Sequence, residues 1–131
     1  MFRIDIRNPR HGWIDVDFVL GDRRFELTAS HVLNDPVTEL AELALFVARS
    51  DPGQADVTFW LEPAGYGLRA SRGPDLKLAV LYAEYAGRRL WDPSVVSEHP
   101  VGVSSTASEI VRCLRAAQPA FEAACAADSY A

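Results

Sequence analysis

The sequence has no apolar stretch that approaches the roughly 20 residues a helix needs to cross a bilayer. Its first ten residues alternate charged and bulky side chains, so the continuous apolar segment of a secretory signal peptide is also missing. These two absences argue against a membrane protein and predict a cytosolic protein that does not bind membranes.

Cysteine is scarce, with only Cys113 and Cys125 in 131 residues. In one expected helix, their separation of 12 positions puts the Cα atoms about 18 Å apart, whereas a disulfide needs about 7 Å or less. We therefore expect two buried thiols in a reducing compartment. A chain of this length can form a core without disulfide or metal staples, which predicts a single domain over residues 1–131.

The side-chain sets that usually carry catalysis or bind a metal are missing. The three histidines are far apart, and none has a second His or Cys at ligand spacing: His11, His31 and His99. Asp15 and Asp17 share a strand face, but a hard cation needs more oxygen ligands, and nearby arginines favour a surface charge lattice. The glycines of residues 65–67 lack phosphate-binding spacing. We expect no metal, no cofactor and no enzymatic activity.

The net charge of −5 is concentrated in one part of the chain. Residues 34–63 hold one Arg against six acids, which accounts for the whole excess, while the flanking parts are neutral. Such an acidic region argues against nucleic acid and leaves a protein partner with a basic surface as a hypothesis. A solvated helix face that aids solubility is the alternative explanation.

The clearest element is a helix over residues 34–50, because Asp35 can cap its first turn and Pro36 suits its first position. The apolar stripe that we expect to face the core consists of Val37, Leu40, Ala41, Ala44, Val47 and Ala48. Glu39, Glu42 and Phe46 fall on the opposite side. Phe46 is therefore either a contact for a partner or a ring packed along a neighbouring side chain.

Alternating apolar residues predict strands on both sides of this helix. Before it, strands over 2–7 and 13–20 are followed by a Gly21-Asp22 hairpin turn that pairs Phe18 with Phe25. After it, we expect a strand over 55–62 and two more, with Leu61 opposite Tyr66 and Ala70 opposite Leu76. The last of these strands is apolar on both faces, which predicts a central or doubly covered position.

The end of the chain gives weaker patterns. We interpret residues 87–104 as an irregular connection, with a short strand at Val95 and Val96 as the alternative. Thr106 and Glu109 form a capping-box pattern that predicts the start of a second helix. Pro119 should bend or interrupt that helix. Its expected core stripe consists of Ala107, Ile110, Val111, Leu114, Ala117, Phe121 and Ala124.

Together these elements predict an α+β fold, with a largely antiparallel sheet of about six strands in the order β-β-β-α-β-β-β-α. Both helices should pack on one face of the sheet. The other face would then carry Trp13, Asp15, Asp17, Thr58, Trp60, Glu62, Arg69, Lys77 and Tyr85.

Three short motifs between Leu27 and Tyr82 resemble a known group of proteins. They are Asp35-Pro36 opening a leucine-rich helix, Glu62-Pro63 ending a strand, and Gly65-Tyr66 opening the next. In these motifs the chain resembles small uncharacterised bacterial α+β domains, some of them similar to immunity proteins of polymorphic toxin systems. The resemblance implies a bacterial cytosolic protein that acts by stoichiometric binding, with no catalytic residues.

We therefore expect a non-enzymatic protein-binding domain, with an immunity-type inhibitor as one form of it. The candidate partner-binding residues are Trp60, Glu62, Thr58, Tyr85, Phe46, Glu39, Glu42 and Trp91. Trp60 is the favoured contact, although the loop around Trp91 could equally cover its face. The alternative function is small-ligand binding in a pocket between the sheet and residues 87–104.

Overall fold

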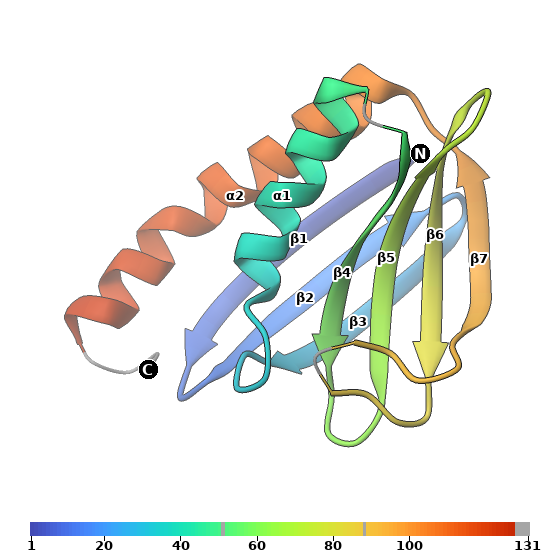
Figure 1. Cartoon of the computed structure of the whole chain (residues 1–131). Helices are drawn as coiled ribbons and strands as arrows, with labels where there is room; N and C mark the ends of the chain where they lie inside the picture. Colours follow the sequence, from blue (N-terminus) through green and yellow to red (C-terminus); the bar gives the residue numbers. More distant parts are fainter. Residues whose placement is uncertain (51, 88, 128–131) are drawn as a thin grey trace.

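Seven antiparallel strands form one sheet, and their order across the sheet is their order in the chain. The computed structural model describes residues 1–50, 52–87 and 89–127 (Figure 1). The elements are β1 (Phe2–Arg10), β2 (Trp13–Leu20), β3 (Arg23–Ser30), α1 (Pro36–Arg49), β4 (Gly53–Trp60), β5 (Gly65–Arg72), β6 (Leu76–Ala83), β7 (Ser94–Pro100) and α2 (Val103–Ala126). The α+β class and the antiparallel pairing are as predicted, with one strand more than expected.

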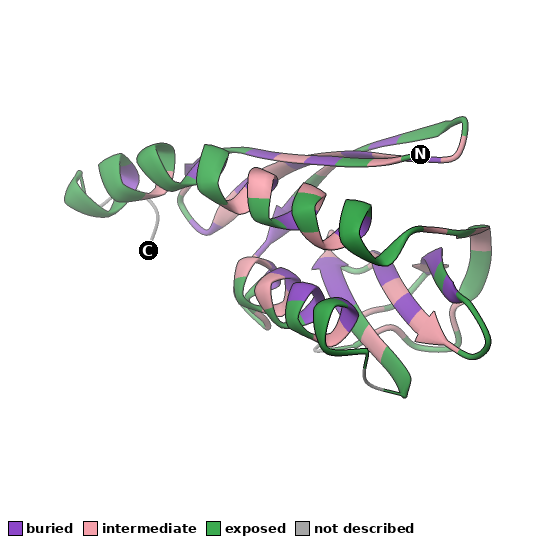
Figure 2. Cartoon of the chain, turned by 90° about the horizontal axis from the view of Figure 1, so that it is seen from above, coloured by how far each residue is buried: buried purple, intermediate pink, exposed green. Residues whose placement is uncertain are grey.

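The sheet is divided into two halves that are joined by the pairing of Ser30 with Trp60. Strands β1–β3 run obliquely to β4–β7 in Figure 1, and both helices lie over the same face, as predicted. Helix α2 packs along β1, and α1 packs on β4 and against α2. The Phe18 and Phe59 rings, one from each half, stack at 5.9 Å between centroids. In Figure 2 the buried faces of the helices and strands meet in this space, whereas the end of α2 is mainly exposed.

The predicted register of the first half is confirmed. Phe18 lies opposite Phe25 and Val16 opposite Leu27, so the apolar side chains of β2 and β3 share a face. Gly21 has a φ of 65°, as the first position of a type II′ turn requires.

The predicted register of the second half is wrong by two residues at both turns. Phe59, not Leu61, lies opposite Tyr66, and Ala70 lies opposite Leu78. The β4–β5 connection begins at Leu61, whose N–H donates to the Ala64 carbonyl oxygen at 2.8 Å. A slip of two residues keeps every side chain on its predicted face because the strand period is two.

Strand β7 corrects the interpretation of residues 87–104 as irregular. It pairs with β6 over most of its length, with a register irregularity between Val80 and Leu81. Edge strands that are exposed on both sides carry little apolar alternation, which is why the pattern offered a strand here only as the alternative, a short one at Val95 and Val96. The presence of β7 makes β6 an internal strand, as predicted, and Ala79 and Leu81 on the second apolar face of β6 are only 4% and 3% exposed.

Helix α1 begins where predicted, and the Asp35 carboxylate accepts hydrogen bonds from the Val37 and Thr38 N–H groups. Its buried stripe differs slightly from the expected one. Leu43 is buried, and Ala48 is exposed, because the helix is covered by α2 as well as by the sheet.

Helix α2 differs more from the prediction. It begins at Val103, and Gly102 occupies the N-cap position, where no side chain accepts a hydrogen bond. The predicted capping box of Thr106 and Glu109 therefore does not form. The helix continues through Pro119. Pro119 and Arg115 are both exposed, so water can solvate the Arg115 carbonyl that lacks an amide partner. None of the helices in the described ranges is long and apolar enough to span a membrane.

The two cysteines do not form a disulfide, as predicted. Cys113 is buried, and burial raises the pKa of its thiol to about 12. Cys125 is exposed, which corrects the expectation of two buried thiols, because it lies on the part of α2 that extends beyond the sheet.

Glu109 has a different role from capping, because it binds the free edge of β1. Its carboxylate accepts a hydrogen bond from the Ile4 N–H at 2.9 Å. Arg112 pairs with this carboxylate at 2.6 Å and donates to the Ile4 carbonyl oxygen. The two side chains thus satisfy an edge-strand residue that another chain could otherwise pair with.

This contact should make stability depend on acid pH. The hydrogen bond from Arg112 lowers the pKa of Glu109 from its ordinary value of 4.5. The contribution of the Glu109 carboxylate to the free energy of unfolding is therefore present above pH 4.5. It is lost as the pH falls through the pKa that Glu109 has in the folded state. In Glu109→Gln we expect the free energy of unfolding to fall less steeply below that pH. Urea titrations between neutral and acid pH measure this slope.

Glu122→Gln, on the exposed side of the same helix, controls for the lost charge. Identical slopes in the wild type and in Glu109→Gln would contradict the assignment.

Candidate functional site

The second face of β4–β6, opposite the helices, is partly covered by residues 84–87 and 89–93. The Ala86 N–H donates to the Pro63 carbonyl oxygen at 2.7 Å, and Ala86 pairs with Leu90. The Trp91 N–H donates to the Tyr85 carbonyl oxygen at 3.1 Å. The segment is therefore a closed loop whose position on the sheet is set by backbone hydrogen bonds.

Two glycines of β5 provide the space into which this loop packs. A Cβ atom added at Gly65 would lie 2.7 Å from the Ala86 Cβ and 2.9 Å from a Leu90 methyl carbon. One added at Gly67 would lie 3.0 Å from the other methyl carbon of Leu90. Gly65 and Gly67 thus form the packing surface for Leu90. From the sequence alone, they indicated only a hairpin.

Gly65→Ala should separate the loop from the sheet. The added methyl group would overlap Ala86 and Leu90, so we expect a loss of about 1–3 kcal/mol in the free energy of unfolding. Amide hydrogen exchange should also become faster in residues 84–93. Gly73→Ala is the matched control, because no atom lies within 4 Å of its added Cβ. Equal stability and exchange in the two variants would show that Leu90 does not depend on the glycine.

The covering loop changes the role of Trp60 and Thr58. Thr58 is only 4% exposed, and the Trp60 indole nitrogen is buried with no hydrogen-bond partner among the described residues. The prediction that Trp60 is freely available on an open face is wrong. The alternative, that the loop around Trp91 covers this face, fits the structure.

Two further candidates hold α1 to the sheet. The Glu39 carboxylate accepts hydrogen bonds from the Thr58 N–H at 2.8 Å and from the Asn34 amide at 3.0 Å, and its burial raises its pKa. Phe46 is half-buried beneath the Arg72 guanidinium, whose carbon lies 5.5 Å from the ring centroid. Both residues were expected on a free helix face. Both instead make contacts within the fold. Phe46 packs along a neighbouring side chain, which was the alternative explanation for it.

The acidic region over residues 34–63 is therefore not one continuous patch. Asp35 caps α1, Glu39 binds β4, and Asp56 pairs with Arg69 at 2.7 Å. Asp51 lies outside the described residues, and Glu42 and Glu62 are exposed on separate elements.

Asp15 and Asp17 belong to a charge lattice on the outer face of β1–β3. Asp15 accepts hydrogen bonds from Asn8, Arg10 and Thr28, and the bond from Asn8 is the main reason that its pKa is lowered. Asp17 binds Arg24 at 2.6 Å. In the part of the chain that the structure describes, no three His, Cys, Asp or Glu residues are grouped so that they could hold a metal ion.

Tyr85 and Trp91 are the large aromatic residues that the loop exposes. They are 67% and 70% exposed, and a hydrogen bond from the Trp91 N–H to the Tyr85 carbonyl oxygen joins their backbones. Two clefts flank Trp91, and we name them after the residues that distinguish them.

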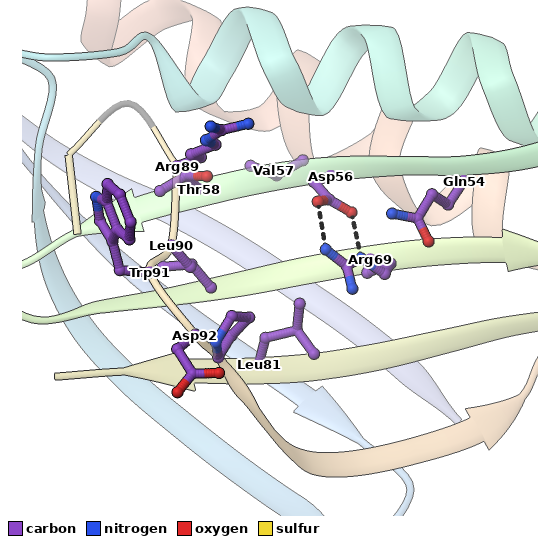
Figure 3. Close-up of a pocket in the computed structure, with 11 residues that line it drawn as sticks. Gln54, Asp56, Val57, Thr58, Arg69, Leu81, Arg89, Leu90, Trp91 and Asp92 are labelled. Carbon is purple, nitrogen blue, oxygen red and sulfur yellow. Dashed lines mark hydrogen bonds and ion pairs between the residues drawn. The ribbon is translucent and has the colours of Figure 1, made fainter. Parts of the chain in front are cut away.

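The Arg69 cleft, of about 390 Å³, lies between the sheet and residues 89–93. Its sheet wall contains the Asp56–Arg69 pair, which is bidentate with distances of 2.7 and 2.8 Å (Figure 3). The cleft has the location that the small-ligand alternative requires. Asp56 and Arg69 already neutralise each other there, and Arg89 and Asp92 also line this cleft.

The Tyr85 cleft, of about 370 Å³, lies on the other side of Trp91. Its lining includes Tyr85, Trp91, Glu84 and Asp92. Neither carboxylate forms an ion pair or hydrogen bond with another described residue. Of the predicted partner-binding residues, the structure thus brings Tyr85 and Trp91 together. It adds Glu84 and Asp92, which lie beside Tyr85 and Trp91 in sequence but were not singled out.

No protein-family model and no curated protein sequence matches this chain. Among solved structures, one chain of the CdiA-CT/CdiI toxin and immunity complex from Enterobacter cloacae is similar. The match has a TM-score of 0.52 and 12% sequence identity, and it covers 89% of this chain and 100% of that chain. At this identity the comparison shows a shared fold: the protein has the α+β fold of a chain found in a toxin and immunity complex.

Proposed function

We propose that the protein is an immunity-type inhibitor of a bacterial toxin, acting in the cytosol by stoichiometric binding and without catalysis. The fold shared with a chain of a toxin and immunity complex supports this proposal. The bacterial domains that the motifs of residues 27–82 resemble support it independently.

The single observation that carries the proposal is the pair of exposed aromatic rings at Tyr85 and Trp91. Exposed Trp and Tyr are the side chains that most often dominate binding energy at protein interfaces. Because backbone hydrogen bonds and Leu90 already hold the loop in place, little conformational entropy would be lost on binding. We call Glu84, Tyr85, Trp91 and Asp92 the Tyr85–Trp91 surface. Its two acids favour a toxin with a basic contact surface.

Titration against the toxin encoded by the neighbouring gene tests the proposal. We expect a 1:1 complex by calorimetry and toxin activity that falls linearly until one equivalent has been added. An enzyme that modifies the toxin would instead abolish its activity at about a tenth of an equivalent. That result, or the absence of a complex, would contradict the proposal.

Small-ligand binding remains the second candidate, because the Arg69 cleft lies between the sheet and residues 89–93. Thermal-shift screening with anionic and zwitterionic metabolites tests it. A ligand whose stabilisation is lost in Arg69→Met, while toxin binding is unchanged, would favour this function. A screen without such a ligand would contradict it.

A further inference from the structure

We infer that the Tyr85 cleft binds an arginine side chain of the protein partner. This inference rests on the proposed function, in that the occupant comes from a protein. It adds the chemistry of the contact, which follows from the side chains that line the cleft.

The aromatic rings provide the first part of the argument. Tyr85 and Trp91 both line the cleft, and their side chains are largely exposed before any partner binds. The face of an indole or phenol ring attracts a cation, and a planar guanidinium also stacks on it. Arginine therefore fits a cleft lined by two exposed aromatic rings better than an ammonium group or an apolar side chain does.

The carboxylates provide the second part. Glu84 and Asp92 line the same cleft, and the described residues that line it include no Lys or Arg. A guanidinium between them could form charge-assisted hydrogen bonds with either one while it contacts the rings.

Comparison with the Arg69 cleft shows why the cation is assigned to this side of Trp91. There the Asp56 carboxylate already accepts hydrogen bonds from Nε and Nη2 of Arg69. An arginine of the partner would have to displace that pair and would meet a like charge. In the Tyr85 cleft neither cost arises from the described residues.

Binding of small arginine probes to the full-length protein tests the inference without any toxin. Nα-acetyl-arginine amide is titrated while the indole N–H resonance of Trp91, assigned with Trp91→Phe, is followed by NMR. We expect saturable binding that weakens as salt is added. The isosteric neutral probe Nα-acetyl-citrulline amide should bind at least ~5-fold more weakly, because it lacks the charge that the rings and carboxylates attract.

Charge-neutralising variants locate the probe. The Glu84→Gln/Asp92→Asn double variant should weaken arginine binding by at least ~5-fold. Glu42→Gln, an exposed acid on α1, should leave it unchanged. Equal binding of the arginine and citrulline probes, or undiminished binding in the double variant, would overturn the inference. Since no partner is present, the probe can bind even if the toxin titration fails. Conversely, a toxin complex with no arginine binding would overturn this inference alone.

Discussion

Replacing Leu40 with alanine is expected to lower the free energy of unfolding by about 2–5 kcal/mol. Leu40 is 0% exposed and lies on α1 in the core where the helix meets the sheet. The truncation removes apolar contacts and leaves a cavity, because α1 is held between β4 and α2 and cannot move freely to fill it. Urea unfolding followed by circular dichroism measures the change.

Leu45→Ala on the same helix is the matched control. Leu45 is 49% exposed, so the same truncation there should change stability by no more than about 0.5 kcal/mol. Similar losses in the two variants would mean that helix propensity, and not burial, sets the effect. An unchanged midpoint in Leu40→Ala would show that the stripe does not contribute to the core.

Local sequence patterns predicted the elements whose stability depends on local contacts. A slip of one residue would expose Phe18 or Phe25, and the two-residue Gly21-Asp22 turn selects one register among those that keep both side chains on the buried face. At the β4–β5 turn the pattern permits registers that differ by two residues. The observed register places Leu61 in the turn, where its N–H donates to the Ala64 carbonyl oxygen, and this hydrogen bond has no sequence signal.

Long-range contacts decided the features that the sequence did not predict. Glu109 fits a capping box locally, but it binds Ile4, which lies 105 positions away. Strand β7 lacks alternation because it is an edge strand, and it is defined by its partner β6.

The candidate site was predicted in part for the same reason. Tyr85 and Trp91 were named among the candidate partner-binding residues, and both are exposed on the loop that carries them. Phe46 and Trp60 were assigned to free faces from the periods of their own helix and strand. The periodicity of a single helix or strand cannot show that Arg72 covers Phe46, or that the indole nitrogen of Trp60 is buried. The signal that could have revealed the covering loop is the pair Gly65 and Gly67, since alternate glycines in a strand mark a close approach.

If the proposed function is correct, Trp91→Ala should weaken binding of the partner by at least ~2 kcal/mol, which is about a 30-fold rise in Kd. The indole is 70% exposed and packs between two clefts, so its removal leaves the fold intact. We therefore expect a thermal midpoint close to that of the wild type. Calorimetric titration of the toxin and a thermal melt of the free protein measure the two quantities separately.

Trp60→Ala should have the opposite effects, because Trp60 is half-buried beside the covered Thr58. We expect a loss of about 1–3 kcal/mol in stability. Binding at a temperature where the variant is folded should change little. This comparison separates interface from core with the same substitution on one face of the protein. If Trp91→Ala destabilised the fold and Trp60→Ala weakened binding, the Tyr85–Trp91 surface would not be the interface, and the exposed acids Glu42 and Glu62 would be the next residues to replace.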